Sequence, residues 1–169
     1  MASMASLIGF PAVVNEKAAR VVAAGVVVIT AFTLATGWLW LSALLAVGFA
    51  LRVAAGPRYS PLGRLASGTV APRLGEPRIV AGAPKQFAQG VGLVFTLAAT
   101  VALVLGAPVV TVVLLSVLLV FASLEAFLGF CAGCFVFGKL IRLGLVADDT
   151  CAECADISLR RVRREPVAG

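Results

Sequence analysis

The sequence predicts an all-α, polytopic membrane protein with four transmembrane helices arranged as two hairpins. Three observations support this fold class. The chain of 169 residues is 61% hydrophobic and only 13% charged, its apolar residues form long runs, and its cationic residues avoid two short turns. Soluble domains carry about a quarter charged residues and rather under half apolar ones. Since a water-soluble core cannot cover this much apolar surface, we expect lipid around one domain.

The apolar runs are long enough to cross a bilayer, whose hydrocarbon core of roughly 30 Å takes about 20 helical residues. The predicted spans are about 18–35, 38–55, 87–105 and 108–130. The first two are slightly short, which interfacial flanks accommodate. Thr36–Gly37 closes the first hairpin, and Pro108 suits the first position of the helix that follows the second turn. The spans form a domain over 1–145, with a connector over 56–86 and a charged tail over 146–169.

The cationic residues predict the orientation. All fourteen Lys and Arg residues lie around the start of the first span, in or beside the connector, or after the fourth span, and neither turn has any. The positive-inside rule then places both termini and the connector in the cytoplasm, and we expect the protein in the plasma (inner) membrane. Trp38 and Trp40 lie beside an outer turn, as interfacial aromatic residues do.

The two hairpins resemble each other. Each begins with a polar, basic segment, "NEKAAR" and "PKQFAQ", and both enter the membrane from the same side. This pattern predicts a parallel repeat about an axis along the membrane normal, with chance likeness of two apolar hairpins as the alternative. In the connector, a short interfacial helix around Leu62–Val70 and an irregular surface segment both remain open.

Several functions are disfavoured. The chain has no histidine, which removes the commonest general base and transition-metal ligand. The first twenty residues lack the basic segment that opens a signal peptide. Single-stranded nucleic-acid binding needs base-stacking aromatic residues, and Tyr59 is the only one in the connector. We therefore expect no nucleic-acid partner, and the basic segments suit anionic lipid headgroups of the bilayer.

Four cysteines form two C-x-x-C pairs, Cys131 with Cys134 and Cys151 with Cys154. Cysteines three apart share a helix face, and a lone cysteine in a span would be read as a small hydrophobic residue. The first pair is predicted at the cytoplasmic interface, on a helix that continues from the fourth span to Arg142. The paired spacing predicts that Cys131 and Cys134 form a redox pair, with Cys151 and Cys154 as a second pair in the tail.

The second pair has its own local pattern. Thr150 and Glu153 have the spacing of a capping box, which would put Cys151 in the first turn of a helix, where a thiolate is stabilised. Nearby acidic residues oppose this effect, so the direction of the pKa change stays open. Together the pairs read C-x2-C-x16-C-x2-C, which is typical of a metal site. A Zn²⁺ ion or iron–sulfur cluster held by Cys131, Cys134, Cys151 and Cys154 is therefore an alternative to a redox role without a cofactor.

Glu125 is the only acidic residue within an apolar run, and acidic residues inside a membrane are paired or functional by default. Three interpretations are open: an ion pair with Arg52, a polar site for a substrate or proton, and an orientation toward the headgroups. In a straight helix Glu125 lies about half a turn from Cys134 and would be a poor base for it. A break at Gly129 or Gly133 would change that arrangement.

Several segments occur together in a recognisable order: "FPAVVNEKAARVVAAG", "RYSPLGRL", "PKQFAQGVGLVF" and "GFCAGC". Over about 10–143 the chain resembles a family of small bacterial four-helix membrane proteins, domain of unknown function 4395. The resemblance implies an integral membrane protein without an established activity, accompanied by thioredoxin-like or sulfurtransferase proteins. The tail lies outside the resemblance.

The leading prediction is a thiol-redox or sulfur-relay component on the cytoplasmic face of the membrane. A protein with a four-cysteine metal site is the first alternative. The others are a transporter or channel for small sulfur anions, which would need a homo-oligomer because four short helices leave little room for a path, and a structural subunit without chemistry.

Overall fold

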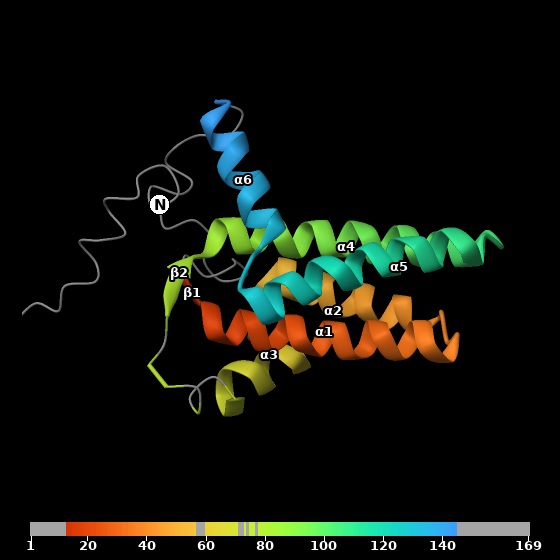
Figure 1. Ribbon diagram of the computed structural model, residues 1–169, viewed down its shortest axis with the longest axis horizontal. Coiled ribbons are helices and arrows are strands. Elements are labelled where there is room, and N and C mark those ends of the chain that lie inside the picture. Colours follow the sequence, from red (N-terminus) through yellow and green to blue (C-terminus); the bar gives the residue numbers. More distant parts are fainter. Residues whose placement is uncertain (1–12, 57–59, 71–72, 74, 77, 145–169) are drawn as a thin grey trace, which may run out of the picture.

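The computed structural model describes residues 13–56, 60–70, 73, 75–76 and 78–144. Four long helices lie side by side, with the two hairpin turns at one end of the bundle and the shorter elements at the other (Figure 1). The long helices are α1 Glu16–Thr36, α2 Leu41–Ala55, α4 Gly82–Val104 and α5 Pro108–Ser123, the last of which continues as a π-helical turn, η4 Leu124–Leu128. The predicted all-α class and the two helical hairpins agree with this architecture.

Three of these helices are long and apolar enough to cross a membrane: α1, α4, and α5 together with η4. Helix α2 is apolar but has only 15 residues, about 22 Å at the usual rise per residue. It is shorter than predicted because 38–40 belong to the turn. Helix α4 begins at Gly82 rather than 87, so Lys85 lies within it.

The hairpin turns use glycine in the left-handed conformation. Gly37 ends α1 with φ 73°, and Gly106 lies between α4 and α5 with φ 77°. In the first turn the rings of Trp38 and Trp40 stack at 6.3 Å, and both side chains are exposed. Such amphipathic rings suit a membrane–water interface.

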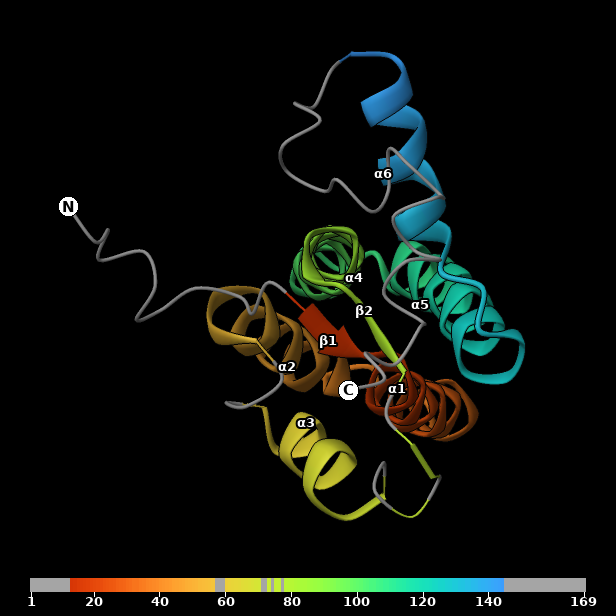
Figure 2. The same ribbon diagram turned by 90° about the vertical axis from the view of Figure 1, so that its left-hand side faces the viewer.

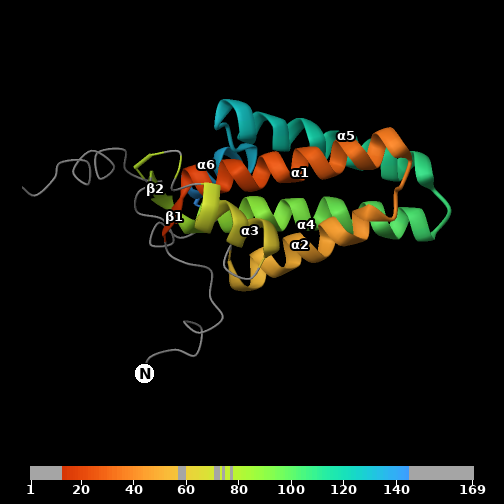
Figure 3. The same ribbon diagram turned by 90° about the horizontal axis from the view of Figure 1, so that it is seen from below.

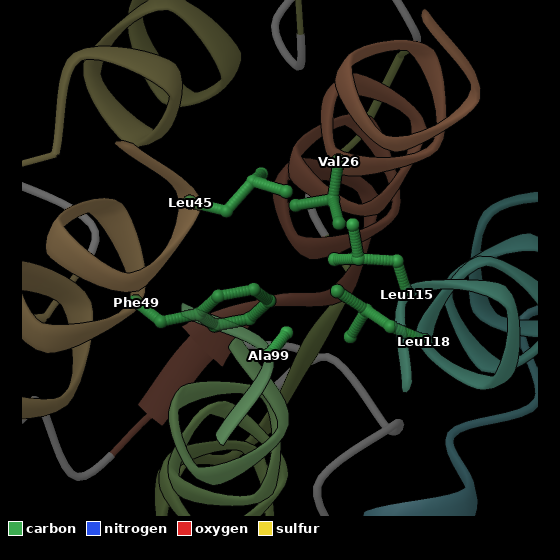
Figure 4. Packing of buried hydrophobic residues seen from close by; sticks show 6 residues of the cluster. All are labelled: Val26, Leu45, Phe49, Ala99, Leu115 and Leu118. Carbon is green, nitrogen blue, oxygen red and sulfur yellow. The ribbon is translucent and has the colours of Figure 1, made fainter. Parts of the chain in front are cut away.

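The core lies where α1, α2, α4 and α5 meet. α1 packs against α5 and α2 packs against α4, and these neighbours lie side by side in Figure 3. Figure 4 shows the central cluster, which consists of Val26, Leu45, Phe49, Ala99, Leu115 and Leu118. The outer surface of the bundle is also apolar: Val94, Val101 and Val109 are all more than half exposed. Exposed apolar residues along a bundle are expected where lipid is the solvent.

A short two-stranded ribbon was not predicted. Strand β1, Val13–Asn15, pairs antiparallel with β2, Ile79–Ala81, so that Val14 lies opposite Val80. The ribbon crosses the end of the bundle (Figure 2). Its β-branched residues favour strands, but three residues are too few for a periodic signal in the sequence.

The connector contains helix. α3, Pro61–Leu65, is followed by a π-helical turn, η2 Ala66–Val70, which supports the helical interpretation of this segment. In Figure 2 α3 lies beside α1 and α2, and α6 packs against α4.

The prediction of a continuous helix from the fourth span to Arg142 is wrong. The helix ends at Leu128, three residues follow without helical structure, and a separate helix, α6 Ala132–Arg142, turns away from the bundle (Figure 1). The cause is Gly129, whose φ of 66° ends the helix in a conformation that glycine adopts readily.

Candidate functional site: a thiol pair beside a buried ion pair

The break at Gly129 determines where the first cysteine pair lies. Cys131 has an extended backbone and is the N-cap of α6, and its Sγ accepts a hydrogen bond from the backbone N–H of Cys134 at 3.4 Å. Cys134 lies in the first turn of the same helix. Both residues carry free thiols and are partly buried. The first residue of this C-x-x-C pair therefore caps a helix N-terminus, where unpaired N–H groups favour a thiolate.

Helix α6 is held against α4 on the side that carries the pair. A Cβ atom on Gly133 would lie 2.6 Å from the Cβ of Ala88, so only glycine allows this approach. Phe137 and Ile141 are buried one and two turns further along, and the Phe137 ring lies 5.6 Å from that of Phe87. The thiol pair is thus fixed relative to the start of α4.

An ion pair lies beside the thiols. Lys85 Nζ, near the start of α4, lies 2.6 Å from Glu125 Oε1 in η4, and the two side chains are 9% and 15% exposed. Lys85 is close enough to act electrostatically on Cys131 and Cys134. In the sequence Lys85 is one of the connector cations, because 40 residues separate it from Glu125 and no local pattern joins the two.

The interpretation that Glu125 pairs with Arg52 is wrong. Arg52 Nε donates to Gln89 Oε1 at 2.9 Å, its Nη1 lies 3.5 Å from Ser60 Oγ, and its guanidinium stacks over the Phe49 ring at 4.4 Å. Lys85 reaches Glu125 because α4 begins earlier than predicted. Arg52 still attracts Glu125 through space.

The two thiols differ in acidity. The pKa of Cys131 lies below its ordinary value, chiefly because the Cys134 thiol donates a hydrogen bond to it. The charge of Lys85 and the Cys134 backbone N–H act in the same direction, whereas burial and the Glu125 carboxylate oppose them. The pKa of Cys134 lies above its ordinary value because of that hydrogen bond and because of burial. Cys131 is therefore the sulfur that ionises first and the stronger candidate nucleophile.

A cavity of about 330 Å³ extends from the core cluster to the start of α6. Its wall is mostly apolar and includes the rings of Phe49, Phe87, Phe95 and Phe121. Gln89, Glu125 and Cys131 contribute polar groups to the same wall. Glu125 and Cys131 thus face one space, although a straight helix would have kept the carboxylate and the thiol pair apart.

Arg20 also belongs to the site, although no sequence pattern connects it with the cysteines. Its guanidinium donates from Nε to the carbonyl of Ala126 at 3.2 Å and from Nη2 to that of Phe127 at 2.9 Å. These carbonyls belong to the last turn before Gly129 and have no partner within a continuing helix. Arg20 therefore stabilises the helix end that positions Cys131.

The second cysteine pair, Cys151 and Cys154, lies outside the described residues. Within the described part of the chain, no three Cys, Asp or Glu side chains are grouped as metal ligands would be. Cys131 and Cys134 could supply two thiolates, and the other two ligands of the four-cysteine alternative would come from the tail. The four-cysteine site accordingly stays a prediction.

Residues 14–142 match the family described as domain of unknown function (DUF4395). The chain belongs to the DUF4395 family. The match includes Lys85, Glu125, Cys131 and Cys134 and ends before the second cysteine pair, which agrees with the resemblance identified from the sequence. No curated protein and no solved structure matches the chain.

Proposed function

We propose that this DUF4395 protein is a thiol-redox or sulfur-relay component on the cytoplasmic face of the plasma membrane. The observation that carries the proposal is the position of Cys131 at the N-cap of α6, with its Sγ 3.4 Å from the N–H of Cys134. In this arrangement one sulfur is an activated nucleophile and the other is the resolving thiol. Cys131 attacks a disulfide of a soluble thioredoxin-like partner to form a mixed disulfide, and Cys134 then attacks Cys131, so that the partner leaves as a dithiol; in the reverse exchange the Cys131–Cys134 disulfide oxidises a partner dithiol. With a sulfurtransferase persulfide, Cys131 takes the sulfane sulfur and releases the partner's thiolate, and the attack of Cys134 on Cys131 then releases sulfide.

The proposed topology has four membrane-spanning helices and both termini in the cytoplasm. It is supported by the distribution of charge: among the described residues, the basic side chains lie toward the ribbon end, in or beside α3, α6 and the ends of the long helices, and residues 37–40 and 105–107 of the turns have none. The positive-inside rule assigns that end to the cytoplasm. Helix α2 crosses with the help of the interfacial residues Trp38 and Trp40.

The two hairpins form a parallel repeat in this proposal. Antiparallel pairing of β1 with β2 about Val14 and Val80 is the pairing that a two-fold axis along the membrane normal would produce. The packing of α1 on α5 has its counterpart in that of α2 on α4. Each hairpin is also followed by a short helix, α3 or α6, that packs on the first helix of its own hairpin.

The tail pair, Cys151 and Cys154, is proposed to exchange with the first pair, and the basic tail stays at the membrane surface. If all four thiolates hold Zn²⁺ or an iron–sulfur cluster instead, purified protein will contain about one metal site per chain, and its cysteines will resist alkylation until a chelator is added.

The test is redox trapping in intact cells. Cells are exposed to diamide or dithiothreitol, quenched with acid and alkylated with a maleimide mass tag. The proposal requires a reversible change of two tags in a Cys151→Ser/Cys154→Ser variant, and its loss on adding Cys131→Ser. Thiols that never change state, together with an unchanged sulfur phenotype in a Cys131→Ser strain, would refute it.

A further inference from the structure

The cavity beside Cys131 suggests which oxidant the thiol pair would use. A dithiol that becomes a disulfide releases two electrons and two protons, and these need an acceptor. The cavity of about 330 Å³ falls within the usual size of small-molecule sites, about 300–1,000 Å³. Its wall combines many apolar groups with a few polar ones, which is the usual composition of such sites.

The four phenylalanine rings in the wall favour a flat, apolar occupant. Phe49, Phe87, Phe95 and Phe121 come from three helices, α2, α4 and α5, and enclose the cavity together with Ala122. Aromatic side chains bind ring systems by stacking and edge contacts. A charged peptide or a hydrophilic anion would find too few partners on this wall.

The cavity also borders the outer surface of the bundle. Phe121 and Val91 line it, yet they are 45% and 37% exposed, and both lie in helices long and apolar enough to cross a membrane. An occupant dissolved in the bilayer could therefore arrive from the lipid side.

A few polar side chains line the cavity beside Cys131. Gln89 and Glu125 share the wall with Cys131, and the Gln89 side chain offers an amide donor for a carbonyl oxygen. Lys85 keeps the Glu125 carboxylate in place through the 2.6 Å contact. A ring with two carbonyl oxygens and lipid solubility describes one class of two-electron acceptor.

We propose that the cavity binds a lipid-soluble quinone, which oxidises the Cys131–Cys134 dithiol. This inference rests on the proposed thiol-redox function. The Cys131 thiolate and the Cys134 thiol form one S–S bond, and their two electrons pass to the quinone. The ring takes up the Cys134 proton and one proton from solvent on its two oxygens, and it leaves as the hydroquinone.

The test uses the full chain with Cys151→Ser and Cys154→Ser, reduced, purified in detergent and kept without oxygen. Decylubiquinone is the probe, because its fully substituted ring resists irreversible addition of thiols. The expected result is about one hydroquinone for each Cys131–Cys134 disulfide, measured by absorbance and peptide mapping, as the two-electron balance requires.

A pair of variants locates the reaction. Ala122→Phe fills the cavity and is expected to slow quinone reduction by about tenfold or more, whereas Val120→Phe, on the exposed side of the same helix, is expected to change it by less than about twofold. Oxidation of each variant by diamide shows whether the thiol pair is intact. If Ala122→Phe keeps its diamide reaction and loses only the quinone reaction, the inference is supported.

Three results overturn the inference. If diamide forms the disulfide but decylubiquinone does not, the quinone site is refuted while the thiol-redox function stands. The same holds if the Ala122→Phe variant reduces decylubiquinone as fast as the protein without that substitution. If neither oxidant forms the Cys131–Cys134 disulfide, the proposed function fails as well.

Discussion

Removing either partner of the Lys85–Glu125 ion pair should strongly destabilise the protein. The two charged atoms lie 2.6 Å apart and the side chains are 9% and 15% exposed. The variants Lys85→Met and Glu125→Gln each leave one charge without its counter-ion. The double variant removes both charges and therefore measures how strongly they are coupled.

The size of the effect follows from the geometry. Two unit charges 2.6 Å apart attract with about 6 kcal/mol at an effective dielectric constant near 20. Desolvation offsets part of this attraction, and breaking a buried pair by removing one partner typically costs about 3–5 kcal/mol. Because both side chains retain some exposure, we expect the lower end, about 3 kcal/mol for each single variant.

The assay is reversible unfolding in mixed micelles, with the helical circular dichroism signal followed as sodium dodecyl sulfate increases. The double variant should lose less stability than the sum of the single variants, with a coupling of about 2 kcal/mol or more. Arg78→Gln is the matched control: Arg78 pairs with Glu16 at 2.9 Å, but its side chain is 54% exposed, so the loss should stay below about 1 kcal/mol. Losses below about 1 kcal/mol for both single variants of the buried pair would refute the reasoning.

Two further predictions concern the thiol pair and its helix. Since the pKa of Cys131 is lowered and that of Cys134 raised, iodoacetamide should modify Cys131 first as pH rises. Lys85→Gln removes a cation that favours the thiolate, so the rise in the Cys131 modification rate should move to higher pH. Peptide mapping checks the order, and faster modification of Cys134 would contradict it. Gly133→Ala should weaken docking of α6 by about 1–3 kcal/mol through overpacking and increase the hydrogen exchange of α6 amides. In the control Gly138→Ala the added Cβ has no atom within 4 Å, so exchange should stay unchanged or fall. Equal exchange in both variants would show that the close approach at Gly133 does not hold the helix.

Hydropathy located the long helices because apolar runs and glycine turns are local features. α1, α4 and α5 lie close to the predicted spans, and the turns at Gly37 and Gly106 follow from glycine and proline placement. The end of the fourth span was less certain, because a glycine in an apolar run can continue a helix or end it. Only the φ of 66° at Gly129 decides between these outcomes.

The candidate site combines local and distant features. The spacing of Cys131 and Cys134 is visible in the sequence, and their role as a pair was predicted from it. Their relation to Lys85 was not, because it depends on α4 beginning at Gly82 and on η4 lying beside that start. Arg52 lies at a depth similar to that of Glu125 but donates a hydrogen bond to Gln89 instead. This pairing depends on which faces of α2 and α4 meet.

The central claim, that Cys131 and Cys134 form a functional redox pair, is tested most directly by a redox titration. The full chain carrying Cys151→Ser and Cys154→Ser is equilibrated in glutathione or dithiothreitol buffers, trapped with acid and analysed by peptide mass spectrometry. The account predicts one two-electron transition to a Cys131–Cys134 disulfide, with a midpoint roughly between −270 and −120 mV, the range of exchange-active C-x-x-C proteins. If no potential produces that disulfide, the account is contradicted.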